Sequence, residues 1–187
     1  MVDPRRPDAF ELVEAAAAAG LAGIKFHPYE LNLADYDFPQ AIAVAQHAAA
    51  RGLWCAVCCS YGRLHVYDVS GVRLVIALAK SLRSPIIALH GGGRQVLDVM
   101  SIAAEAPNIL IETSFSLPFW RGSSVEMDFA FAMRKLGAQR WLFGSDHPYM
   151  PMRQSREDLL DFLQTYKFSE TDVEQIMSGT ARALFNR

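Results

Sequence analysis

Two side chains suited to acid–base chemistry follow short apolar segments of this sequence. His90 comes after the apolar run 85–89 and begins a His-Gly-Gly-Gly segment, and Asp146 comes after the run 141–143 and a Gly-Ser turn. Short apolar runs bounded by Gly or Pro are typical of buried β-strands. In α/β barrels the catalytic groups lie at the carboxyl ends of the parallel strands. The sequence therefore predicts that His90 and Asp146 share a catalytic site, with simple turn residues as the alternative.

Further candidates follow from the alternation of side chains along a strand, since the last inward positions of each strand line the mouth of such a site. Lys25 and His27 have the same parity on the predicted strand 23–27. Lys25 is a candidate for binding a substrate carboxylate, or else a lysine whose ammonium reaches solvent at the rim. His27 is a second substrate-binding candidate, or else a turn residue ahead of a proline.

Parity also places a serine near the same site. Ser114 shares its face of the fourth predicted strand with Glu112, so it is a third candidate for contact with substrate. On the third predicted strand, His90 has the same parity as Ala88 and Ile86. We therefore expect Ala88, Ile86 and His90 to point inward together.

Three cysteines lie in the second predicted strand, 53–59. Either Cys58 or the pair Cys55 and Cys59 faces the site. Buried cysteines most often serve as small hydrophobic side chains, although a Cys58 thiolate is a candidate metal ligand. Closely spaced cysteines in an apolar run do not resemble the disulfide framework of a secreted protein, so we expect a cytoplasmic location.

Helical and strand patterns alternate along the whole chain. Strands are predicted near 23–27, 53–59, 85–90, 108–113 and 140–145, and helices near 8–19, 39–51, 69–82, 94–106, 124–136, 156–166 and 169–185. Continuously apolar strands separated by helices indicate parallel pairing in a sheet covered by helices. The prediction is an α/β fold in which residues 1–187 form a single domain.

Composition and charge exclude several classes of protein. The chain has 187 residues, of which 51% are hydrophobic and 20% charged, as in an ordinary soluble domain. A net charge of −2 without runs of Lys or Arg argues against nucleic acid as a partner. No apolar stretch reaches the roughly 18 residues of a membrane span, so no membrane partner is expected.

Several segments together resemble one enzyme family. They are GIKFHP (23–28), IIALHGGG (86–93), NILIETS (108–114), WLFGSDHP (141–148) and QIMSGTARALF (175–185). Their order and spacing resemble strands 4, 6, 7 and 8 and the closing helix of the amidohydrolase-related superfamily of metal-dependent TIM-barrel hydrolases and decarboxylases. The resemblance implies a partial (β/α)8 barrel of about five parallel strands with flanking helices, lacking the first three strands.

The resemblance also implies a divalent metal, zinc or a similar ion. It assigns Asp146 as the metal-binding aspartate, His90 as the acid–base histidine beside the metal, and Cys58 to the position of a histidine ligand. A His-x-His pair, which supplies two further ligands in the family, is absent from this sequence. Since protein metal sites generally need three or four ligands, the chain alone is expected to bind metal weakly or not at all.

Two functions from different classes remain. The first is an enzyme that hydrolyses a C–N or C–O bond, or decarboxylates a small molecule, with its missing strands supplied from elsewhere. The second is an inactive truncated barrel that serves as a binding or assembly module. A serine esterase is disfavoured, because the His-Gly-Gly-Gly segment is not followed by the G-x-S-x-G nucleophile motif.

Five strands cannot close a barrel, so two sheet edges are expected to carry unpaired backbone groups beside apolar side chains. We therefore expect a homo-oligomer, or a partner chain that covers these edges.

Overall fold

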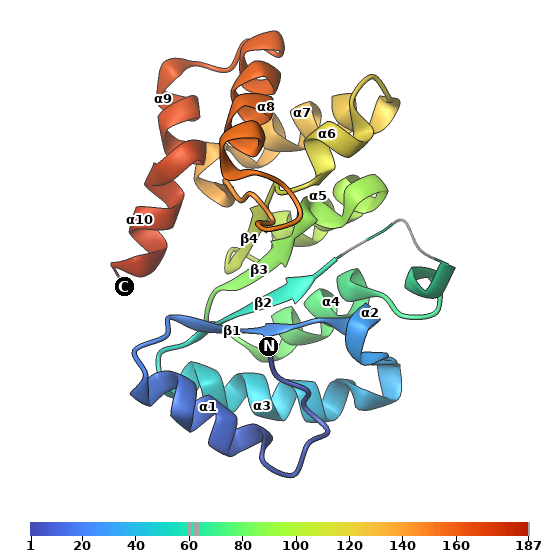
Figure 1. The fold of residues 1–187 in the computed structure, drawn as a ribbon, viewed down its shortest axis with the longest axis vertical. Helices are drawn as coiled ribbons and strands as arrows, with labels where there is room; N and C mark the ends of the chain where they lie inside the picture. Colours follow the sequence, from blue (N-terminus) through green and yellow to red (C-terminus); the bar gives the residue numbers. More distant parts are fainter. Residues whose placement is uncertain (60, 62–63, 187) are drawn as a thin grey trace.

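A computed structural model describes residues 1–59, 61 and 64–186, without the side chains of residues 65 and 66. One five-stranded sheet with the strand order β1-β2-β3-β4-β5 runs through the molecule (Figure 1), and all of its strand pairs are parallel. The strands are β1 (Gly23–Phe26), β2 (Trp54–Cys58), β3 (Ile86–Leu89), β4 (Ile109–Glu112) and β5 (Trp141–Leu142). The predicted α/β fold with five parallel strands is confirmed.

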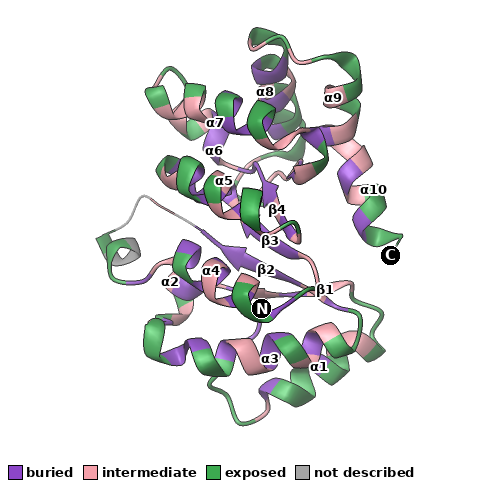
Figure 2. Ribbon diagram, turned by 180° about the vertical axis from the view of Figure 1, so that it is seen from behind, coloured by how far each residue is buried: buried purple, intermediate pink, exposed green. Residues whose placement is uncertain are grey.

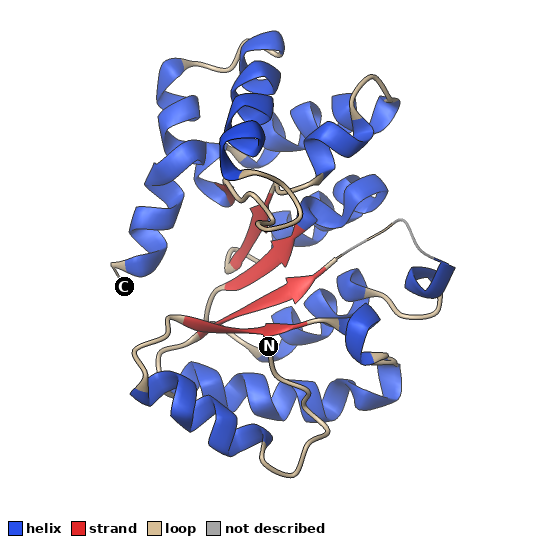
Figure 3. Ribbon diagram, viewed as in Figure 1, coloured by secondary structure: helices blue, strands red, loops and turns tan. Residues whose placement is uncertain are grey.

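Helices connect the strands and flank the sheet (Figure 3). The longer ones are α1 (Ala9–Ala18), α3 (Phe38–Ala50), α4 (Gly71–Ser81), α5 (Val96–Glu105), α7 (Ser124–Leu136) and α8 (Met152–Thr165). Two short helices, α2 (Pro28–Leu31) and α6 (Ser116–Trp120), follow β1 and β4. Both begin just beyond the carboxyl end of a strand, so they shape the rim of the sheet.

The C-terminal segment differs from the single helix predicted over 169–185. It consists of α9 (Glu170–Glu174), a π-helical turn (Gln175–Gly179) and α10 (Thr180–Phe185). The start agrees with the predicted cap, because Ser169 and Asp172 form a reciprocal capping box. The π-helical turn brings the Ile176 carbonyl to β5, where it accepts a hydrogen bond from Phe143 N at 3.1 Å.

The two faces of the sheet are covered differently. One face forms the main hydrophobic core with helices α1, α3, α4, α5 and α7, and buried residues run through the sheet between them (Figure 2). The opposite face contributes Ala56, Ile87 and Leu142 to a smaller cluster with Leu184 of α10. In a closed barrel the corresponding face lines the interior, and here α10 covers part of it.

The predicted parity of β3 is wrong. Ile86 and Ala88 belong to the core beneath the helices, whereas Ile87 belongs to the opposite face. His90 reaches the inner face because its φ angle is 62°, which breaks the alternation just after the strand ends. The extent of β5 also differs from the prediction of 140–145, since the strand stops at Leu142.

At each edge of the described sheet, one backbone hydrogen bond connects the edge strand, or the residue that follows it, to a flanking segment. Val2 N donates to Lys25 O at 3.0 Å along β1, and Phe143 N uses Ile176 O next to β5. None of the described helices has the length and apolar character needed to cross a membrane.

Candidate active site

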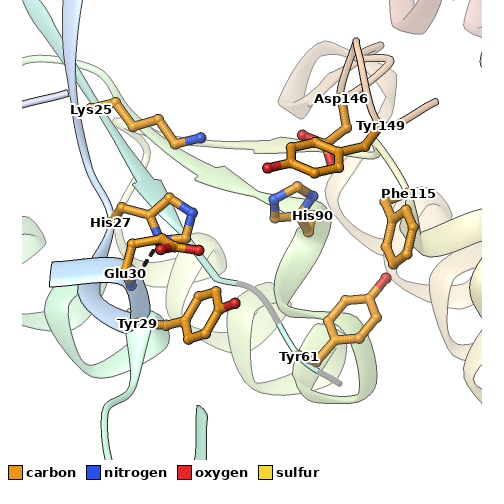
Figure 4. Close-up of a pocket in the computed structure, with 9 residues that line it drawn as sticks. All are labelled: Lys25, His27, Tyr29, Glu30, Tyr61, His90, Phe115, Asp146 and Tyr149. Carbon is orange, nitrogen blue, oxygen red and sulfur yellow. Dashed lines mark hydrogen bonds between the residues drawn. The ribbon is translucent and has the colours of Figure 1, made fainter. Parts of the chain in front are cut away.

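A pocket of about 190 Å³ lies at the carboxyl ends of the strands (Figure 4). Its walls are formed by Lys25, His27, Tyr29, Glu30, Tyr61, His90, Phe115, Asp146 and Tyr149. Four of the side chains selected from the sequence, Lys25, His27, His90 and Asp146, thus lie around one cavity. Figure 4 shows the Lys25 ammonium directed across it toward His90 and Asp146.

His90 is held by hydrogen bonds at its backbone and its ring. Its N–H donates to Glu112 Oε2 at 3.1 Å, and its carbonyl accepts from Ser116 Oγ. Its Nδ1 lies 3.1 Å from Ser114 Oγ and 3.2 Å from the Ser114 carbonyl oxygen. These contacts fix the direction of an imidazole that is only 6% exposed.

Glu112 is the centre of this network. Besides His90 N–H, it accepts hydrogen bonds from Ser114 N at 2.7 Å and from Ser114 Oγ at 2.8 Å. A side chain at Gly144 would overlap the Glu112 carboxyl group, so glycine after β5 makes room for it. Burial raises the pKa of Glu112, while the charge of His90 and the hydrogen bonds from Ser114 oppose this rise.

His90 holds its proton more tightly than an ordinary histidine. Burial lowers its pKa, but a hydrogen bond with the Cys58 side chain and electrostatic interactions with Cys58 and Glu112 outweigh this effect and raise the pKa to about 9. Cys58 of β2 pairs with Leu89 of β3, and Leu89 directly precedes His90 in the sequence. The imidazole is therefore equipped to donate a proton or to bind an anion.

The structure distinguishes between the two predicted orientations of the cysteines on β2. Cys58 interacts with His90, is 2% exposed and is not among the residues that line the pocket. Cys55 and Cys59 belong to the helix-facing core, and burial raises the pKa of the Cys55 thiol to about 12. Cys55 and Cys59 thus act as small hydrophobic side chains.

His27 combines the two roles considered for it. It lines the pocket, and its Nδ1 accepts a hydrogen bond from Glu30 N at 3.3 Å, which caps α2. Ser114, the other predicted substrate contact, does not line the pocket, because its hydroxyl points to His90 and Glu112.

Aromatic side chains form one wall of the pocket. The Tyr61 and Phe115 ring centroids lie 6.2 Å apart, and the Tyr61 hydroxyl donates to Ser116 Oγ at 2.7 Å. Sequence reasoning did not select Tyr29, Glu30, Tyr61 or Tyr149, which come from the segments just after strands. Their position just after strand ends is a signal for pocket residues. However, nothing in the sequence shows which loop residues turn inward.

Three residues that line the pocket have a left-handed backbone. The φ angles are 62° at His90, 62° at Phe115 and 57° at Asp146. Such conformations cost free energy for residues other than glycine, and they concentrate at functional sites where the surrounding structure enforces them. Their occurrence together supports a functional role for this end of the sheet.

The sequence of this chain also matches a known protein family. A sequence model described as amidohydrolase matches residues 1–187. The chain belongs to the amidohydrolase family. Comparison with curated proteins finds no match.

Solved structures similar to this amidohydrolase chain share its fold. An uncharacterised TIM-barrel protein, Bb4693 from Bordetella bronchiseptica, is 16% identical with a TM-score of 0.80 over 100% of this chain and 66% of that one. A 2,6-dihydroxybenzoate decarboxylase from Rhizobium is 18% identical with a TM-score of 0.70, covering 98% and 68% of the two chains. A putative 2-pyrone-4,6-dicarboxylic acid hydrolase from Pseudomonas putida is 17% identical with a TM-score of 0.68, covering 100% and 70%. The amidohydrolase chain thus spans about two thirds of the length of these structures.

The described side chains of this amidohydrolase chain do not form a donor set that fits a metal ion. A similar structure, dihydroxybenzoic acid decarboxylase from Polaromonas, contains manganese. Among the described residues here, no three His, Cys, Asp or Glu side chains are arranged to hold a metal. Cys58, predicted as a ligand with Asp146, instead interacts with His90. A metal site would therefore need ligands beyond those that the described part of the chain supplies.

Proposed function

We propose that this chain forms the substrate-binding and acid–base part of an amidohydrolase-type active site. The reaction is hydrolysis of a C–N or C–O bond, or decarboxylation, of a small carboxylate. One observation carries the proposal: an imidazole fixed by Glu112 and Ser114 shares a small pocket with Lys25 and Asp146. The pocket stands at the carboxyl ends of parallel strands, where enzymes of this architecture act.

The pocket suits a compact anion with a flat body. Lys25 and His90 offer two cations to a carboxylate, and charge-assisted hydrogen bonds of this kind are stronger than neutral ones. Phe115 and Tyr61 offer ring surfaces to an apolar or aromatic body. The cavity of about 190 Å³ restricts the ligand to a small molecule.

His90 is the proposed proton donor. In hydrolysis, the nitrogen or oxygen of the breaking bond keeps the bonding electron pair and takes a proton. In decarboxylation, the carbon that releases CO2 keeps the electron pair and takes a proton. Either step needs an acid with a proton at neutral pH, which the raised pKa of His90 provides. Asp146, which also lines the pocket, is the proposed acceptor for a proton from water or substrate.

The metal-dependent form of this chemistry requires a completed barrel. A TIM barrel has eight strands, and this sheet has the five strands β1 to β5. We propose that a polypeptide of three βα units pairs with the edges at β1 and β5 and provides the missing metal ligands. An apolar groove beside β1, lined in part by Leu12, Leu21 and Ile24, offers a surface for such a unit.

Ligand binding tests the proposed pocket without requiring turnover. Titration with 2,6-dihydroxybenzoate, followed by calorimetry or NMR, should show saturable binding to the isolated chain. Lys25→Met should weaken binding by roughly tenfold or more, the value of one charge-assisted hydrogen bond. Lys80→Met removes the same charge from an exposed position on α4 and should leave binding unchanged. Equal effects of the two substitutions, or no binding by the wild type, would overturn the proposal.

A binding or assembly module is the second candidate. The lack of a fitting metal donor set among the described residues favours it. Saturable carboxylate binding without turnover, even after a complementary three-unit polypeptide and manganese are added, would support this alternative.

We also propose a cytoplasmic location. Cys55, Cys58 and Cys59 are all buried, and none forms a disulfide. Reduced thiols are the usual state in a cytoplasmic protein. Thiol counting on protein isolated under non-reducing conditions tests this proposal.

A further inference from the structure

Glu112 and Ser114 form a hydrogen-bonded chain that ends on the His90 ring. Glu112 Oε2 lies 2.8 Å from Ser114 Oγ, which lies 3.1 Å from His90 Nδ1. All three side chains are buried. Because few solvent molecules reach such a chain, its donors and acceptors must match one another.

The requirement that each donor meets an acceptor determines which atoms of this chain carry a hydrogen. The Ser114 carbonyl oxygen, 3.2 Å from Nδ1, can only accept, so this contact is a hydrogen bond only while Nδ1 carries a hydrogen. The Ser114 hydroxyl has a single hydrogen, and the Glu112 carboxylate takes it. Ser114 Oγ therefore offers a lone pair to Nδ1–H, in agreement with the carbonyl contact.

We infer that Glu112 is a positioning residue that acts through Ser114 to hold a proton of His90 on Nδ1. The inference rests on the proposed function, in which His90 transfers a proton. Glu112 also accepts from His90 N–H, so one carboxylate orients both the ring and the left-handed backbone of this residue. The tautomer of a histidine is generally set by the partner of its other ring nitrogen.

A carboxylate is needed because every neighbour of Glu112 donates. His90 N–H, Ser114 N–H and Ser114 O–H all point to its two oxygens. Glutamine would bring an NH2 group into this set. Either orientation of the amide sets that group against a backbone N–H, of His90 or of Ser114. Where the NH2 group replaces Oε2, the Ser114 hydroxyl accepts from it and turns its own hydrogen toward Nδ1. Glu112→Gln should therefore reverse the chain and favour the proton on Nε2.

NMR of the full chain with 15N-labelled histidine tests this inference. The wild type should show Nδ1 protonated at every pH at which the protein is folded, with only Nε2 changing. Glu112→Gln should shift neutral His90 toward the Nε2–H tautomer. Ser114→Ala should weaken the Nδ1–H signal and speed its exchange with solvent. The Ser114 variant provides an independent measurement where the Glu112 variant is too unstable to study.

Thr113→Val is the matched control. Thr113 lies between the two residues, is equally buried, and bonds Leu142 O instead of His90. The control should retain the wild-type His90 tautomer. An Nδ1–H population and exchange rate unchanged from the wild type in both Glu112→Gln and Ser114→Ala would overturn the inference, as would an equal change in Thr113→Val.

The spectra need no substrate, so this test is independent of whether the proposed reaction is correct. Where turnover is measurable in a completed barrel, Glu112→Gln should lower kcat by roughly tenfold to hundredfold, as loss of outer positioning groups does, with little change in KM. An altered tautomer with unchanged kcat would leave the positioning role standing and would contradict His90 as the proton donor.

Discussion

His90 combines deep burial with a positive charge, and this combination links the stability of the fold to pH. Its pKa of about 9 lies above the roughly 6.5 of a histidine in an unfolded chain. The folded state thus holds this proton more tightly than the unfolded state does. The resulting stabilisation is fully present below about pH 6.5 and is lost as the pH rises through about 9.

The free energy of unfolding should therefore fall between about pH 6.5 and 9, by roughly 1–3 kcal/mol from this residue. His90→Asn should remove this part of the pH dependence, since asparagine is uncharged and tolerates the left-handed backbone. Urea unfolding of both proteins at several pH values measures the difference. Parallel pH profiles for the two proteins would contradict the charge state assigned to His90.

The metal content of the isolated chain is a second prediction at this scale. Cys58 interacts with His90, and no described cluster offers three ligand side chains, so purified protein should carry well under one metal ion per chain. Elemental analysis after gel filtration measures this ratio. A full equivalent of tightly held zinc would show that other donors complete the site.

The His-Gly-Gly-Gly turn is the element that carries His90 from β3 to the pocket. His90, Gly91, Gly92 and Gly93 all have positive φ angles, between 56° and 76°. Side chains would also collide here, because a Cβ atom on Gly91 would lie 2.6 Å from the Phe129 ring. The turn therefore depends on glycine for both its backbone and its packing.

Gly91→Ala should destabilise the protein by roughly 3 kcal/mol, from left-handed strain together with overpacking against Phe129. Gly122→Ala is the matched control, since Gly122 has a φ angle of 76° but no atom within 4 Å of an added Cβ. The control should lose only about 1–2 kcal/mol, from strain alone. Denaturant unfolding gives both values, and equal losses would show that Phe129 moves aside without cost.

At the scale of the whole molecule, the described sheet has two edge strands, β1 and β5. The edge strands β1 and β5 each have a single described backbone contact from a flanking segment, Val2 and Ile176. The groove beside β1 is lined mainly by apolar side chains. Unprotected strand edges beside apolar surface promote association, and a net charge of −2 opposes it little.

The isolated chain should therefore self-associate or aggregate at micromolar concentration, as sedimentation velocity will measure. Leu21→Lys, which places a charge in the groove at a side chain 57% exposed, should reduce association. Met127→Lys changes a side chain of similar exposure, 58%, on α7 and should not. A wild-type monomer with a cooperative thermal transition would contradict the open-edge argument.

Sequence alone determined the alternation of strands and helices and the residues that stand at strand ends. Apolar runs interrupted by glycine and proline predict parallel strands because burial on both faces demands continuous apolar segments. The segments around His90 and Asp146 indicated the family. They could do so because the conformation of a turn depends on residues that are adjacent in the sequence. The Ser169–Asp172 cap was equally local.

Tertiary structure decided which of these side chains meet and how. His90 faces the inner side only because its backbone leaves the alternating geometry, while Ile86 and Ala88 face the helices. Glu112 became central because its carboxylate, at the end of the neighbouring strand β4, accepts a hydrogen bond from His90 N–H. Such contacts depend on φ angles and on packing between strands far apart in the chain, and neither is encoded in the periodicity of a single segment.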